Sequence, residues 1–234
     1  MRQFIKYIWN GEEILPRGVY KMIFRQSMIQ YFQRTNGIKK RYEYGEVRHI
    51  QHHYLNKEIL YASNDPIIQN FQITTQKYNC EHVWCKSYSK LNKILSIDLH
   101  NIYLADKKKN EERGVQHYGK NGFIPEKKSK GKISRTISYI HLQYPNTFEH
   151  YHQKMIKMED MIRWNMKYPP TYFELYRNEF IHHYQGNYNP FIRYPILFYL
   201  FYNDEWNLAE LCKEFKKTTE SVIKSSIIRY THLL

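Results

Sequence analysis

Two short segments, 78–87 and 98–114, combine the residue types that phosphodiester hydrolysis requires. That reaction needs a base to activate water, a hard cation to neutralise charge developing on the phosphate, and oxygen ligands to hold the cation. Glu81 and Asn110 offer a carboxylate and an amide carbonyl, which suit Mg²⁺, an ion that keeps several waters and takes few protein ligands. The imidazole of His82 can accept a proton near neutral pH. The two segments therefore predict a metal-assisted hydrolase.

The same segments resemble the bacterial endonuclease I family, within the ββα-metal (HNH-like) nuclease superfamily. The family's first signature is matched by Asn79, Glu81, His82, Trp84 and Ser87. The second is matched by Asp98, Leu99, His100, Asn101, Asn110 and Arg113. A third stretch, remote from both, resembles the C-terminal part of the family through Glu174, Arg177, Asn178, Gln185, Gly186, Asn187, Asn189, Pro190 and Phe191. Three blocks in the family's order, over roughly residues 78–195, argue against a chance resemblance.

The resemblance implies a role for each matched polar residue of the first two blocks. His82 would be the general base, and Glu81 and Asn110 the metal ligands. Arg113 would help near the phosphate. Asn101, which resembles the middle Asn of HNH motifs, would orient the imidazole of His82.

The resemblance also implies a fold and a reaction. The expected fold is α+β, with a small ββα-metal centre inside a mainly helical domain: Glu81 and His82 leave one strand, 98–104 forms its partner, and Asn110 lies on a helix that crosses both. The expected reaction is hydrolysis of DNA, with RNA as a further candidate substrate, using Mg²⁺ or another divalent cation such as Mn²⁺ or Ca²⁺. It would leave 5′-phosphate and 3′-hydroxyl ends and show little base selectivity, because attack on the backbone needs no contact with base edges.

Other readings of the same residues remain open. Cys85 stands where the family usually has Pro, which questions the local backbone shape. Cys80, His82, Cys85 and His100 could instead hold a structural zinc ion. For His100 a hydrogen-bonded structural role is favoured over a catalytic one.

The third block favours structure over substrate contact. Its Asn, Gln and Gly residues suit a tight turn in which side-chain amides satisfy buried backbone groups. Glu174 and Arg177 are spaced to pair with each other on a helix.

The elements that must position these residues follow from spacing and from turn residues. Apolar residues at helical intervals predict a helix over 19–35, ended by Asn36-Gly37. The His-rich segment that follows, to about residue 57, reads as a surface loop or helix. Further expectations are short strands at EILYAS (58–63) and FQITTQKY (71–78) around a turn at 64–66, a Gly- and Lys-rich loop at 120–135, and helices over 134–183 that break at Tyr144-Pro145 and Pro169-Pro170.

The domain organisation expected from these patterns is one nuclease domain over 1–204 with a helical appendage over 205–234. The domain comprises an N-terminal helical part at 1–57, the metal centre at about 78–119 and a C-terminal helical part at 134–204. The appendage resembles a helix-turn-helix, whose second helix would enter a DNA major groove.

The composition constrains the partner. Lys and Arg total 36 against 22 Asp and Glu, a formal charge of +14, which suits a polyanionic partner such as nucleic acid, although an AT-rich genome also enriches Lys.

No apolar run is long enough to span a bilayer, and the longest, FIRYPILFYLFY, is expected in the core. Three cysteines and no secretory signal pattern indicate an intracellular or virion-associated setting, and the sequence leaves the oligomeric state unknown.

Two rival functions accompany the nuclease. One is a non-catalytic nucleic-acid-binding protein on the same scaffold, which has lost turnover through the change at Cys85. The other is an endonuclease made site-selective by the C-terminal helices.

Overall fold

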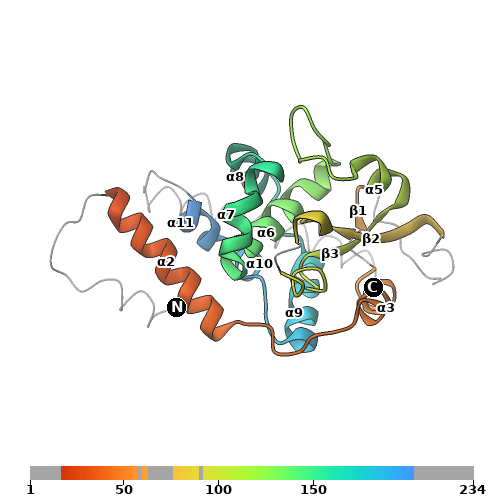
Figure 1. Ribbon diagram of the computed structural model, residues 1–234, viewed down its shortest axis with the longest axis horizontal. Helices are drawn as coiled ribbons and strands as arrows, with labels where there is room; N and C mark the ends of the chain where they lie inside the picture. Colours follow the sequence, from red (N-terminus) through yellow and green to blue (C-terminus); the bar gives the residue numbers. More distant parts are fainter. Residues whose placement is uncertain (1–16, 57–58, 63–75, 90–91, 203–234) are drawn as a thin grey trace, which may run out of the picture.

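The structure, a computed structural model, describes residues 17–56, 59–62, 76–89 and 92–202, and it is an α+β fold with a small sheet among many helices. The described α-helices are α2 (Arg17–Thr35), α3 (Tyr44–His53), α5 (Lys107–Arg113), α6 (Lys127–Gln143), α7 (Pro145–Tyr151), α8 (Met158–Lys167), α9 (Tyr172–Gln185), α10 (Pro190–Arg193) and α11 (Ile196–Tyr202). Two short 3-10 helices, η1 (Lys86–Tyr88) and η2 (His152–Lys154), join them. The sheet, α3 and α5 lie at one end of the molecule, whereas α2 and α11 lie at the other (Figure 1).

The sheet has three strands in the order β1-β3-β2, formed by β1 (Ile59–Leu60), β2 (Tyr78–His82) and β3 (Ile102–Asp106). Strand β2 runs antiparallel to β3, with Glu81 opposite Tyr103 and His82 opposite Ile102. Strand β1 pairs with the other side of β3 in parallel. Among the described strands β2 is an edge strand, and helix α5 packs against both β2 and β3.

Helix α5 follows β3 directly and completes the expected ββα unit. Asp106 ends the strand and caps the helix, because its carboxylate accepts a hydrogen bond from the backbone N–H of Lys109. The partner strand is shorter than expected, since it begins at Ile102 rather than at residue 98. Residues 98–101 form a turn, in which Asp98 O accepts from Asn101 N and the Asp98 carboxylate accepts from His100 N.

Helix α6 is the centre of the helical part. It buries side chains around almost its whole circumference and packs against α2, α7, α8 and α10 (Figure 1). The expected loop at 120–135 is therefore wrong from Lys127 onward. Gly131 suggested a loop, but a Cβ at this position would overlap the carbonyl oxygen of Tyr168, so the glycine permits close packing of the helix.

Most of the other helices and strands expected from the sequence can be compared with the structure. The structure confirms helix α2, which ends before Asn36, and it shows the His-rich segment as helix α3. It also confirms the helix breaks at Pro145 and Pro169, and the apolar run 191–202 contributes to the core. Of the two expected strands, the first is present as β1, whereas Gln76 and Lys77 are helical and the second starts only at Tyr78. Residues 71–75, the turn at 64–66 and the appendage at 205–234 lie outside the described residues. No described helix has the length and apolarity needed to cross a membrane.

Candidate active site

Glu81 lies on β2 with its side chain almost fully buried. Its Oε1 accepts a hydrogen bond from the hydroxyl of Tyr61 at 2.7 Å and from that of Tyr118 at 3.3 Å, and it lies 3.1 Å from Nη1 of Arg113. Burial raises the pKa of Glu81, and the positive charge of Arg113 offsets this only in part. The carboxylate is therefore held in one orientation by two phenols and one guanidinium.

Arg113, at the end of α5, is also buried, with 1% of its surface exposed. Its guanidinium donates to the backbone carbonyls of His82 and Val83 at 3.2 and 3.1 Å, in addition to its ion pair with Glu81. It also lies over the ring of Tyr118, 4.6 Å from the centroid. In place of the expected position beside a phosphate, the structure directs Arg113 inward, where it joins α5 to β2.

His82 ends β2 with its imidazole 2.9 Å from the carbonyl oxygen of Ser96. A carbonyl can only accept, so Nε2 carries the proton and Nδ1 keeps the lone pair in the neutral ring. Burial lowers the pKa of His82, and the charges of Lys86 and Arg113 lower it further. Tyr44 of α3 stacks on the imidazole, with ring centroids 5.8 Å apart and planes 17° apart. A neutral, oriented imidazole with its basic nitrogen at Nδ1 is the form a general base requires.

Asn101 makes no hydrogen bond to the imidazole, contrary to the role expected for it. Its amide oxygen accepts from the backbone N–H of Trp84 at 2.7 Å, and its Nδ2 donates to the carbonyls of Trp84 and Leu95 at 3.3 and 3.1 Å. Leu95 is the neighbour of Ser96, whose carbonyl holds His82. Asn101 therefore contacts the imidazole only indirectly: it binds the carbonyl of Leu95, and the carbonyl of the next residue, Ser96, contacts His82.

Asn110 lies on α5 and reaches β2. Its Nδ2 donates to Oδ1 of Asn79 at 2.8 Å and to the carbonyl oxygen of Cys80 at 3.4 Å. Since both hydrogen bonds use the amide nitrogen, the amide oxygen is left for another partner. The expectation that Asn110 lies on a helix crossing the two strands is confirmed.

The structure brings the three key residues onto β2 and the adjoining α5, but no hydrogen bond joins their side chains. Side chains alternate along a strand, so Asn79 and Glu81 face one side of β2, and Cys80 and His82 face the other. Arg113 connects them, because it contacts both the Glu81 carboxylate and the His82 carbonyl.

The donor chemistry on the Glu81 side fits a hard divalent cation. Tyr61 and Tyr118 both donate to Oε1 of Glu81, and Asn110 uses its amide nitrogen for its hydrogen bonds, so a carboxylate and an amide oxygen remain as hard donors of the kind that Mg²⁺ prefers. Groups of three or more His, Cys, Asp or Glu side chains able to hold a metal do not occur among the described residues. A site with few protein ligands and several waters is the arrangement consistent with both observations.

The zinc alternative is wrong for this fold. Cys85 Sγ contacts the carbonyl of Gly114, His82 contacts Ser96, and His100 contacts the carbonyl of Asn187. These side chains have separate partners instead of one shared centre. His100 is fully buried, and burial lowers its pKa to about 4, which supports the structural role expected for it.

Cys85 keeps a backbone shape close to that of the Pro it replaces. Its φ of −47° and ψ of 135° lie near the range that a pyrrolidine ring imposes, and the residue begins η1. The substitution therefore leaves the local chain path intact. The sequence could not reveal this, because Cys has no φ preference of its own.

The third block is structural, as its composition indicated. Gln185 donates to the carboxylate of Asp98 at 2.8 Å and accepts from the backbone of Leu99, and Asn189 accepts from the backbone of Phe191 and donates to the carbonyl of Arg135. Gly186, with φ of 88°, ends α9 in the left-handed conformation that favours glycine.

The expected pairing of Glu174 with Arg177 is wrong. Glu174 forms a buried two-pronged ion pair with Arg135 of α6, at 2.6 and 2.7 Å. Arg177 donates to the carbonyls of Leu99 and Ile102, both at 2.6 Å. Helix α9 thereby fixes the turn that precedes β3.

Sequence reasoning missed Tyr61, Tyr118, Tyr44 and Ser96. Each lies more than ten residues from the group it contacts, and three of them are tyrosines in a chain that has 23, so no local spacing distinguished them. Only the tertiary fold selects them.

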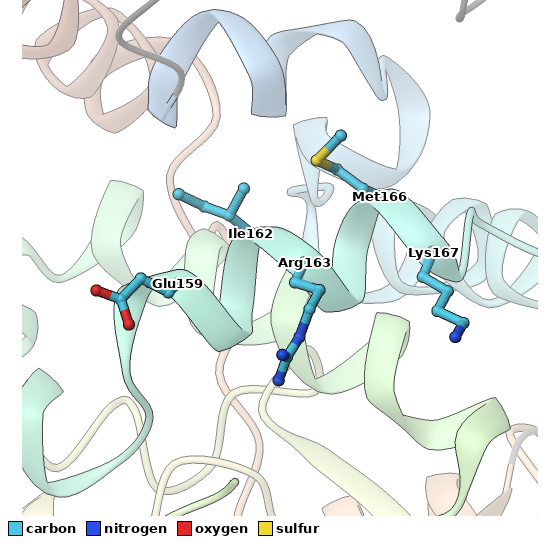
Figure 2. A pocket seen from close by; sticks show the side chains of 5 residues that line it. All are labelled: Glu159, Ile162, Arg163, Met166 and Lys167. Carbon is cyan, nitrogen blue, oxygen red and sulfur yellow. The ribbon is translucent and has the colours of Figure 1, made fainter. Parts of the chain in front are cut away.

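Of two hollows on the described surface, only one adjoins residues that contact the candidate site. The larger, about 540 Å³, is a shallow, mostly apolar surface along α8, and Figure 2 shows that a single helix supplies its lining: Glu159, Ile162, Arg163, Met166 and Lys167. The smaller, about 250 Å³, lies between α3 and β2 and includes Asn79 and Cys80. Since Asn79 and Cys80 both contact Asn110, the smaller hollow is the one associated with the candidate site.

Comparison with known families gives one match. The sequence model of the Endonuclease I family matches residues 117–196, which contain α6 to α10 and the whole third block. The match begins after Arg113, so it leaves out the segment that holds the five candidate site residues. A search of curated proteins finds no match.

Proposed function

We propose that this chain is a nuclease, because its residues 117–196 match the Endonuclease I family model, and that it hydrolyses DNA with a divalent cation at β2 and α5. The observation that carries the proposal is the ββα unit itself. It presents the Glu81 carboxylate, the Asn110 amide and an oriented His82 imidazole on two adjoining elements.

In this proposal the residues of the chain have distinct tasks. Glu81 and Asn110 hold the cation, which when bound neutralises charge on the phosphate. His82 accepts a proton from the attacking water at Nδ1, while Ser96 holds Nε2–H and Tyr44 covers the ring. Arg113, Tyr61 and Tyr118 keep the carboxylate in place. The substrate is DNA, and RNA is a second substrate to be tested.

A plasmid-cleavage assay with titrated Mg²⁺, Mn²⁺ or Ca²⁺ tests this function. Wild-type protein is expected to nick and then degrade the plasmid only when a divalent cation is present. His82→Ala is expected to lower the rate by about 10² to 10⁴, the usual contribution of general acid–base catalysis, and to retain DNA binding. His49→Ala, which changes an exposed histidine of α3, is the matched control and should cleave normally. A His82→Ala protein that cuts at the wild-type rate would refute the assignment of the base.

The non-catalytic alternative predicts a different outcome in the same assay. Such a protein would bind DNA with strong salt dependence and cleave under none of the cations. The backbone at Cys85 favours the enzyme, because the residue keeps a conformation close to that of Pro. Deleting residues 205–234 and comparing cut sites tests the site-selective alternative, which requires the cleavage pattern to change.

A further inference from the structure

The hollow between α3 and β2 adjoins the residues that the proposed function uses. It is lined by Tyr44, Arg48 and His52 of α3 and by Tyr78, Asn79 and Cys80 of β2. Tyr44 stacks on the imidazole of His82, and Asn79 accepts a hydrogen bond from Asn110. Two residues of the lining, Tyr44 and Asn79, therefore contact the proposed base and one proposed ligand.

The lining of this hollow contains a positive charge and no negative charge. Its lining contains two phenols, an amide, a thiol, an imidazole and the guanidinium of Arg48, but no carboxylate. Burial lowers the pKa of His52, and the charge of Arg48 lowers it further, so this imidazole is neutral at pH 7. The positive charge of Arg48 also acts on Tyr44. The guanidinium thus lies near groups that cannot neutralise it.

No ion pair or hydrogen bond joins Arg48 to any other described residue, whereas Arg113, Arg135 and Arg177 are buried and donate to carboxylates or backbone carbonyls. A guanidinium has planar, paired N–H donors that match the geometry of a phosphate. Its position on α3, one helical turn from Tyr44, directs it to the same hollow.

We propose that Arg48 binds a backbone phosphate of the nucleic-acid strand next to the phosphate that is cleaved, so that α3 holds the substrate while β2 and α5 carry the chemistry. This inference rests on the proposed function for its substrate. A neighbouring phosphate is inferred because the Glu81 carboxylate does not line the hollow, and Tyr78 and Cys80, which do, alternate with Glu81 along β2 and face its other side.

A binding experiment tests the contact without requiring cleavage. A fluorescently labelled oligodeoxynucleotide duplex is titrated with protein in EDTA at several NaCl concentrations. For Arg48→Gln, affinity at low salt should fall about tenfold, and the slope of log K against log [salt] should decrease by about 0.9 for one lost phosphate contact. Arg48→Lys, which keeps the charge, should restore most of the slope. Arg34→Gln, an exposed arginine in the last turn of α2, is the matched control and should leave the slope unchanged.

A kinetic experiment separates binding from chemistry. With Mg²⁺, Arg48→Gln should raise KM about tenfold and leave kcat within twofold of wild type, because the contact is made equally in the ground state and the transition state. An unchanged KM and salt slope, or a fall in kcat alone, would overturn the inference. If the wild-type protein cleaves nothing, the proposed function fails, and the salt slope still decides whether Arg48 contacts phosphate. Because Arg48 is exposed, both variants should fold, and thermal unfolding checks this.

Discussion

At the scale of single residues, the ion pair between Glu81 and Arg113 determines how the proposed metal ligand is held. Both side chains are almost fully buried, and each also bonds other groups: Glu81 accepts from Tyr61, and Arg113 donates to the carbonyls of His82 and Val83. Removing one partner of a buried pair leaves an uncompensated charge, which is costly in a low-dielectric interior. The ion pair between Glu81 and Arg113 thus stabilises the fold and also holds the proposed metal ligand in position.

Arg113→Met is expected to lower the free energy of unfolding by about 3 kcal/mol, because Glu81 loses its counterion and two carbonyls lose their donor. Urea denaturation measures this. Lys109→Met, which removes an exposed ion pair with Glu112 on the same helix, is the control and should lower the free energy of unfolding far less. If Arg113→Met unfolds at the wild-type urea concentration but no longer cleaves DNA, the arginine acts on the phosphate after all.

Asn101 positions the imidazole through the backbone, and its replacement should show this indirect action. Asn101→Ala removes the acceptor of the buried Trp84 N–H and the donor to Leu95, so the loop that carries the Ser96 carbonyl loosens. We expect kcat to fall at least tenfold with KM nearly unchanged, in steady-state DNA cleavage. Ser96→Ala keeps the carbonyl and removes only a hydroxyl bonded to Lys93, so it should cleave normally. Equal losses in both variants would contradict this role.

At the scale of elements, α6 shows why a sequence rich in Lys, Gly and Ser can form the central helix. Ser129, Gly131, Ser134 and Ser138 are small enough for neighbouring backbone to approach closely, and the serine hydroxyls satisfy nearby groups, such as the backbone N–H of Tyr61. Local propensity favoured a loop at the start of this segment. Tertiary packing favours a helix, because it buries the apolar face and uses the small residues at contacts.

Gly131→Ala is expected to destabilise the protein by about 2 kcal/mol or more, although alanine is the better helix former. The added Cβ would meet the carbonyl of Tyr168, which is backbone and cannot move aside. Gly45→Ala in α3 is the matched control, since no atom lies within 4 Å of its Cβ position, and it should be neutral or slightly stabilising. Thermal or urea unfolding of the two variants measures the difference. A neutral Gly131→Ala would show that α6 and the segment at Tyr168 can separate without cost.

At the scale of the whole molecule, several histidines are packed inside the protein in neutral form. Burial lowers the pKa of His100 to about 4 and that of His141 to about 3. His100 lies against Tyr139, and His141 stacks on Phe148 at 3.8 Å. In the unfolded chain both would take up a proton near pH 6.5.

The stability of the protein should therefore depend on pH in a defined window. Between pH 6.5 and 4 the unfolded chain binds more protons than the folded chain, so the free energy of unfolding is highest above pH 6.5 and falls as the pH is lowered. His100 alone contributes on the order of 3 kcal/mol to this change. Urea denaturation at a series of pH values measures it. His100→Gln should flatten the dependence by about one proton, whereas His150→Gln, at an exposed position, should leave it unaltered. Identical pH profiles for all three proteins would show that His100 does not control acid unfolding.

The sequence by itself determined the parts that depend on local order. The tight turn at Gly186 was predictable from the Asn, Gln and Gly residues around it, whereas the strand with Glu81 and His82 and the helix with Asn110 were expected from the resemblance to the endonuclease I family. The resemblance to the endonuclease I family was also visible, since its three blocks keep their order and spacing.

The tertiary structure decided how those parts act on one another. It turned Arg113 inward, separated the zinc candidates, gave Glu174 the distant partner Arg135, and stacked Tyr44 on His82. None of these contacts follows from local spacing, because each joins residues far apart in the chain. Burial then selects partners, because most enclosed charges and polar groups must find a hydrogen-bond partner inside the protein.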